Sequence, residues 1–270
     1  MGRLIHSEWV KITKGKGLLA LSVLYFLAYA YLTHTHYRWN PTSAWEAMAY
    51  FPYSAGAVTE GLLLLLALSS VYTEEDKGGT TALILSSRYG RARLPLAKLA
   101  AALLFTTVLV LGCWIVCIGT QVWHAGWDGW QEPLREWPRY SLSPYKLSAW
   151  EYVVVQIVTN WLGCAVFAIF LLSLSAWSRH SLTVFFIGGM MLVLPFFIRN
   201  HSSLDIYWLL QNLPMTEVMR VENLYSRPRY VEWKGGRMPL PLASFYLYML
   251  LLAGLFGSAA CRAYRGREIR

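Results

Sequence analysis

Residues 72–98 read YTEEDKGGTTALILSSRYGRARLPLAK, and this charged stretch separates two long apolar runs. It holds too many charges to cross a bilayer. A glycine pair indicates a turn, and either of the two threonines that follow it offers an N-cap for a short apolar helix over residues 80–89. We therefore predict that residues 72–95 form a cytoplasmic loop with a docking helix. The plainer alternative is a solvated connection between two membrane spans.

The rest of the chain is strongly apolar. Hydrophobic residues make up 56% of it and charged residues only 14%, and several long runs are almost free of charge. Runs of about 18 or more apolar residues are typical of transmembrane helices, so the composition indicates a polytopic membrane protein rather than a water-soluble domain. We predict six spans, at about residues 17–33, 51–71, 96–122, 149–176, 181–198 and 240–260.

The N-terminal segment mixes apolar and charged residues at spacings typical of a helix that lies in the membrane surface. With residues 1–16 as this interfacial helix, the prediction is an all-α integral membrane fold, one transmembrane domain over residues 1–270. Six spans put both termini on one side. Lys and Arg are denser on that side, so the positive-inside rule predicts cytoplasmic termini. The outer loops are then residues 34–50, 123–148 and 199–239.

A few polar residues interrupt the predicted spans. Glu60 is the only acid near the middle of a span, where an ionisable group is costly and should face protein or a water-filled cavity. The alternative is that its span starts later and Glu60 lies at the outer mouth. In the fourth span Gln156, Thr159 and Asn160 either hydrogen-bond between helices or line a substrate surface. Glu60, Gln156 and Asn160 are therefore candidates for lining a transport pathway.

No pattern of metal ligands stands out. The four cysteines all fall within apolar stretches and are interpreted as packing residues. His34 and His36 share an outer loop, but no acid or cysteine accompanies them closely, so we interpret them as solvated. The net charge of +9 needs no nucleic-acid partner, because no DNA- or RNA-reading module is recognisable.

The order of these features resembles the permease subunits of ABC-2 type exporters. The opening SEWVKITKGKG is similar to the family's entrance, with Glu8, Trp9 and Lys11 before a basic cluster. The charged loop is similar to the family pattern of acids, a Gly-Thr turn, a short apolar helix, Ser-Arg and a later Lys. In this sequence those positions are Glu74, Glu75, Gly79, Thr80, Leu83, Ile84, Leu85, Ser87, Arg88 and Lys98.

The resemblance implies a division of labour between chains. Two permease subunits, identical or homologous, would form a pathway through a bacterial plasma membrane, and two separate ABC ATPase subunits would bind ATP and Mg²⁺ beneath it. This chain has no G-x-x-x-x-G-K-[ST] phosphate loop, so we expect it to hold no cofactor and to be no enzyme itself. The implied ATPase-coupling residues are Glu74, Glu75, Gly79, Thr80, Leu83, Ile84, Leu85, Arg88 and Arg91.

Three other classes of function are open. An ion-coupled secondary transporter is expected to show several intramembrane charges or an internal repeat, whereas Glu60 stands nearly alone. An intramembrane enzyme would need a nucleophile–base pair or metal ligands at depth, and the spans contain neither H-E-x-x-H nor G-x-S-x-G. A sensor or immunity module of the membrane is not separated from an exporter by the sequence.

Overall fold

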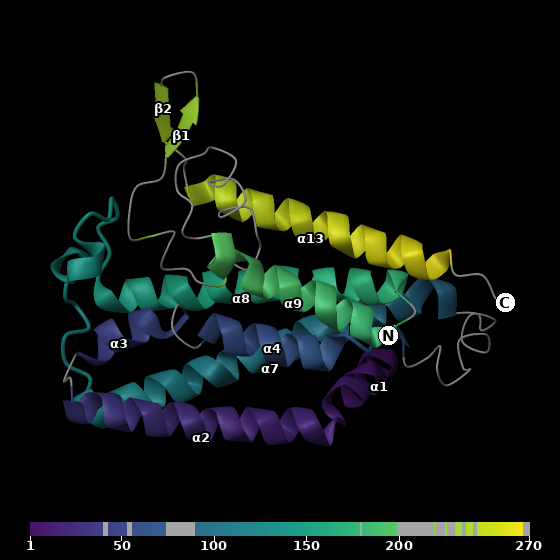
Figure 1. Cartoon of the computed structure of the whole chain (residues 1–270), viewed down its shortest axis with the longest axis horizontal. Helices are drawn as coiled ribbons and strands as arrows, with labels where there is room; N and C mark the ends of the chain where they lie inside the picture. Colours follow the sequence, from purple (N-terminus) through teal and green to yellow (C-terminus); the bar gives the residue numbers. More distant parts are fainter. Residues whose placement is uncertain are drawn as a thin grey trace.

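The computed structural model describes residues 1–39, 43–52, 56–73, 90–178, 180–198, 219, 225, 230–233, 236–239 and 242–266 of the 270-residue chain. Within them the fold is a bundle of long α-helices (Figure 1). The helices are α1 (Gly2–Thr13), α2 (Lys16–Trp39), α3 (Ala44–Phe51), α4 (Ala57–Leu68), α7 (Gly90–Ala125), α8 (Ala149–Trp177), α9 (Ser181–Ile198) and α13 (Leu242–Arg265).

Among the described residues, three helices are long and apolar enough to cross a membrane, which confirms a mainly helical fold of the kind that membranes hold. They are Arg93–Ala125, Ala149–Trp177 and Ala243–Arg265. The first two contain the predicted third and fourth spans, and the last overlaps the predicted sixth span, 240–260, from residue 243 onward. Two shorter apolar helices, Ala57–Leu68 and Ser181–Val193, lie within the predicted second and fifth spans. The predicted first span lies within α2.

Some boundaries differ from the prediction for identifiable reasons. The predicted second span, 51–71, begins at the last residue of α3 and contains α4, and residues 53–55 between the two helices lie outside the described residues. Much of the predicted outer loop 34–50 is helical, since α2 continues to Trp39 and α3 follows it. Residues 90–95 of the predicted cytoplasmic loop are helical too. Pro95 lies in the second turn of α7 rather than the first, where it removes one backbone hydrogen bond.

Short elements lie between the long helices. In the predicted outer loop 123–148 there are two 3-10 turns, η2 (Leu134–Glu136) and η3 (Pro138–Tyr140). In the predicted outer loop 199–239 two short strands, β1 (Tyr230–Trp233) and β2 (Gly236–Pro239), form an antiparallel hairpin. The hairpin is the one departure from helix and turn among the described elements.

Helix α8 is the centre of the bundle. It packs against α4, α7, α9 and α13, and most of its apolar length is buried. Helix α13 lies along one edge of the bundle (Figure 1) and leaves most of its apolar length exposed. Its outward leucines, Leu247, Leu250 and Leu251, have exposed fractions of 60%, 59% and 64%. Large apolar side chains exposed along a whole helix are what a lipid-facing surface requires.

Glycine allows α9 to approach its neighbours closely. A Cβ atom added at Gly188 would lie 2.5 Å from Leu65 Cδ2 in α4 and 2.6 Å from Leu171 Cδ2 in α8. A Cβ added at the neighbouring Gly189 would meet no atom within 4 Å. Gly188, but not Gly189, is therefore a contact point between helices.

We expect Gly188→Ala to destabilise the protein relative to Gly189→Ala. Both substitutions raise the helix propensity by the same amount, so the difference between their stabilities reports the cost of packing. Overpacking at a close helix contact typically costs about 1–3 kcal/mol, and Gly188→Ala should melt at a correspondingly lower temperature in detergent. Equal melting temperatures for the two variants would contradict the close contact between α9, α4 and α8.

Candidate functional site

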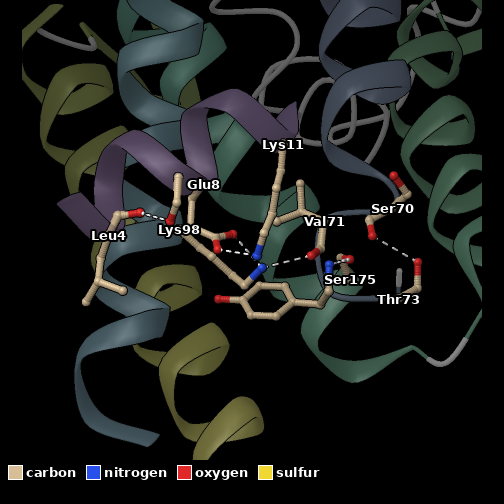
Figure 2. A network of polar contacts seen from close by, with 10 residues as sticks. Leu4, Glu8, Lys11, Ser70, Val71, Thr73, Lys98 and Ser175 are labelled. Carbon is tan, nitrogen blue, oxygen red and sulfur yellow. Dashed lines mark hydrogen bonds and ion pairs between the residues drawn. The ribbon is translucent and has the colours of Figure 1, made fainter. Parts of the chain in front are cut away.

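A buried ion pair joins the N-terminal helix to α7. Glu8 in α1 has an exposed fraction of 2% and Lys98 in α7 has 0%. Lys98 Nζ lies 2.8 Å from Glu8 Oε2 (Figure 2). Lys11, almost one turn further along α1, binds the other carboxylate oxygen from the surface side. Both oxygens of this buried carboxylate therefore have a cationic partner.

Lys98 also holds the turn that follows α4. Its Nζ donates a hydrogen bond to the carbonyl of Val71 at 3.0 Å and lies 5.0 Å from the centre of the Tyr72 ring. The Tyr72 N–H donates to Ser175 Oγ in α8 at 3.2 Å, and Ser175 Oγ donates to the carbonyl of Ser69 at 3.3 Å. Carbonyl groups at the end of a helix need partners from outside it, and here α7 and α8 supply them.

We refer to Glu8, Lys98, Val71, Tyr72 and Ser175 as the Glu8–Lys98 network. Burial by itself raises the pKa of the Glu8 carboxyl, but the positive charges of Lys98 and Lys11 and their hydrogen bonds outweigh burial. The pKa of Glu8 therefore lies below its ordinary value, and the carboxylate is ionised at neutral pH. Because a buried charge without its partner is costly, the network is a fixed joint between α1, α7 and the end of α4.

Residues of the network come both before and after the predicted coupling segment in the sequence. The turn that Lys98 holds leads into that segment, and α7 leads out of it at Gly90, about two turns before Lys98. The predicted coupling residues themselves lie outside the described residues, except Arg91, whose backbone is in the first turn of α7. Those outside are Glu74, Glu75, Gly79, Thr80, Leu83, Ile84, Leu85 and Arg88.

Lys98→Met should destabilise the protein strongly, because it leaves the Glu8 carboxylate buried without its buried partner. Breaking a buried ion pair typically costs about 3–5 kcal/mol. Lys11→Ala is the matched control: its side chain is 51% exposed, so its loss should cost at most about 1 kcal/mol. Thermal unfolding in detergent measures both effects.

A double variant separates the lost pair from lost packing. Glu8→Gln combined with Lys98→Met removes both charges, so it should recover a large part of the melting temperature that Lys98→Met alone loses. If the double variant were no more stable than Lys98→Met, the uncompensated charge on Glu8 would not be the cause.

A second polar cluster is buried between α4, α7 and α8. Asn160 Nδ2 donates to Glu60 Oε2 at 2.8 Å and to the carbonyl of Met219 at 3.0 Å. Asn160 Oδ1 accepts a hydrogen bond from Trp114 Nε1 at 3.0 Å. The Cys164 thiol donates to the same oxygen of Glu60 at 3.3 Å. Glu60 and Asn160 are both 0% exposed, so this cluster is closed to solvent.

Glu60 lies deep in the bundle although it belongs to the first turn of α4. Its partners Asn160 and Trp114 each lie about three helical turns, or about 16 Å, from the ends of α8 and α7 that the loop 126–148 connects. The side chain faces protein at this depth, which is one of the two environments that the sequence allows. Its Oε1 atom has no hydrogen-bond partner among the described residues.

The third pathway candidate, Gln156, and the nearby Thr159 connect α8 to its neighbours. Gln156 Nε2 donates to the carbonyl of Ala49 in α3 at 2.9 Å. Thr159 Oγ1 lies 2.7 Å from Tyr246 OH in α13. With Asn160, these residues link α8 to four other helices, α3, α4, α7 and α13, so they are hydrogen-bonding groups between helices. All three are 0% exposed, so the described fold does not place them on an open surface.

Similarity to known proteins does not decide the function. The chain matches no protein-family model and no curated protein. The inference of function therefore rests on the residues and contacts described above.

Sequence reasoning missed how these residues combine. Glu8 and Lys98 each stand out in the sequence, but 90 positions separate them and no local pattern indicates that they meet. Trp114 and Cys164 carry no signal, because in an apolar run they look like ordinary packing residues. A lysine near the start of a long apolar run was the only available hint, since a buried cation needs an anionic partner.

Proposed function

We propose that the chain is the transmembrane permease subunit of an ATP-driven exporter of the ABC-2 type. Two permease subunits, identical or homologous, form the translocation pathway, and two separate ABC ATPase subunits bind ATP and Mg²⁺. The observation that carries the proposal is the Glu8–Lys98 network, which joins α1, α7 and the end of α4 on both sides of the charged segment. The order of sequence features that resembles ABC-2 permeases supports it further.

The network gives the charged segment a mechanical role in this proposal. Closure of the ATPase pair on ATP displaces residues 74–89, which lie between α4 and α7. Because Lys98 is bonded both to Glu8 and to the turn after α4, these elements move as one body instead of absorbing the displacement separately. Coupling also requires two states of the membrane dimer that the ATPases bind with different affinity.

Six spans with cytoplasmic termini complete the proposal. Helices α2, α4, α7, α8, α9 and α13 supply the spans, and α1 lies at the inner surface of a bacterial plasma membrane. The location of α1 and of the last turn of α13 at the same end of the bundle supports an even number of crossings (Figure 1). Glu60, Gln156 and Asn160 line the pathway in a state in which α4 and α8 move apart.

A second candidate is an ion-coupled secondary transporter, and one observation favours it. Glu60 is a fully buried acid whose Oε1 has no partner among the described residues, and ionisable groups at membrane depth often mark ion pathways. Reconstituted vesicles distinguish the two. Transport that needs the ATPase and ATP supports the exporter, and transport by the permease alone under an ion gradient supports the second candidate.

Leu83→Ala with Leu85→Ala should weaken binding of the ATPase more than Glu75→Gln does. Apolar anchors at the centre of an interface usually carry more binding energy than rim charges, which water and salt screen. The expected losses are about 2 kcal/mol for the double variant and less than about 1 kcal/mol for Glu75→Gln. Co-purification of a co-expressed ABC ATPase measures them.

Ala82→Pro tests coupling separately from binding. A proline inside the predicted short helix breaks it, so ATP hydrolysis should no longer respond to substrate even where some ATPase is retained. As a control, the amount of each variant inserted in the membrane should equal that of the unmodified protein. Full ATPase retention and normal stimulation in both the double-alanine and the proline variants would show that the segment is only a connection.

Cysteine labelling in intact cells tests the proposed orientation. Ser141→Cys, in the exposed loop between α7 and α8, should react with a membrane-impermeant thiol reagent, whereas Ser86→Cys should react only after lysis. Three native cysteines are buried and Cys261 is partly exposed, so the unmodified protein gives the background. If intact cells label Ser86→Cys but not Ser141→Cys, the protein has the opposite orientation in the membrane.

A further inference from the structure

Two histidine side chains meet where α2 and α7 end side by side. The ring centres of His34 in α2 and His124 in the last turn of α7 are 5.1 Å apart, with ring planes tilted by 44°. His34 is exposed and His124 is partly exposed. This end of the bundle is the one opposite to α1 (Figure 1), so the pair is separate from the Glu8–Lys98 network.

We propose that His34 and His124 form a two-histidine binding site for Zn²⁺. Imidazole nitrogens bind Zn²⁺ at about 2.0–2.1 Å, which puts the ion about 3 Å from each ring centre. Two such rings at a tetrahedral angle have centres about 5 Å apart, and the observed separation is 5.1 Å. The exposed side of His34 leaves the remaining positions of the ion open to water.

Buried hydrogen bonds connect α2 and α7 about one turn before the two histidines. Gln121 Nε2, about one turn before His124, donates to Tyr29 OH at 3.1 Å. Tyr29 OH in turn donates to Cys117 Sγ at 3.3 Å, so α2 and α7 are connected through buried hydrogen bonds. Ligands on rigid helices keep their geometry better than ligands on loops, so the two helices are a suitable support for a pair of metal ligands.

The number of protein ligands sets the kind of site. Among the described residues, no group of three or more His, Cys, Asp or Glu side chains is placed to hold a metal ion. A site with two protein ligands differs from a four-ligand structural zinc site, whose metal is needed for folding. Here Zn²⁺ acts as a reversible cross-link between α2 and α7 and stabilises the folded protein by binding to it.

Zn²⁺ titration of the full chain in detergent, without a histidine tag, tests the site. At a concentration about a hundred times its dissociation constant, ZnCl2 should raise the melting temperature by about 5 °C, and MgCl2, whose ion prefers oxygen ligands, should not. His34→Phe keeps a ring in contact with His124 but has no ligating nitrogen. It should melt like the unmodified protein without Zn²⁺ and lose the Zn²⁺-dependent rise.

Calorimetric titration gives a second readout. Loss even of a residue that only supports a metal ligand weakens binding about 10–100-fold, so His34→Phe and His124→Phe should each weaken Zn²⁺ binding at least tenfold. His6→Ala, which removes a distant exposed histidine, should bind like the unmodified protein. The proposal is overturned if ZnCl2 does not raise the melting temperature of the unmodified protein. It is also overturned if both phenylalanine variants keep the rise, because the ion then binds elsewhere, for example at Cys261.

Discussion

The buried ion pair between Glu8 and Lys98 is the constraint on which one end of the molecule depends. Burying either charge without the other would cost much free energy, so the folded chain has to bring α1 and α7 together. As a result α1 is more than a helix resting on a membrane surface. Its Ile12 is 6% exposed, and the ring of Trp9 lies 6.2 Å from that of Phe105 in α7, so α1 is part of the packed bundle.

The two buried networks differ in how completely their polar atoms are satisfied. Every charge in the Glu8–Lys98 network has a partner, so moving its parts separately would expose unpaired charges to a low-dielectric interior. In the Glu60 cluster, one carboxylate oxygen has no partner among the described residues. The first network therefore leaves no charge unpaired, whereas the second leaves one buried acceptor without a partner among the described residues, which costs free energy.

Much of the fold could be predicted from the sequence because membrane helices are encoded locally. The predicted fifth span, 181–198, coincides with α9, and the predicted fourth span, 149–176, differs from α8 by one residue. The loop boundaries were less accurate. Pro95 closes the predicted loop 72–95, yet it is accommodated inside α7, which already begins at Gly90.

The sequence by itself determined the class of the protein, the sites of its main helices and the presence of a charged segment between two apolar runs. These features depend on the average hydrophobicity of about 20 neighbouring residues, and this average can be read directly from the sequence. Only the tertiary structure decided which polar groups meet. Glu8 with Lys98 and Glu60 with Asn160 are separated by 90 and 100 positions, and His34 and His124 face each other only because α2 and α7 end together. Such pairings depend on how helices pack, and no local pattern in the chain encodes that.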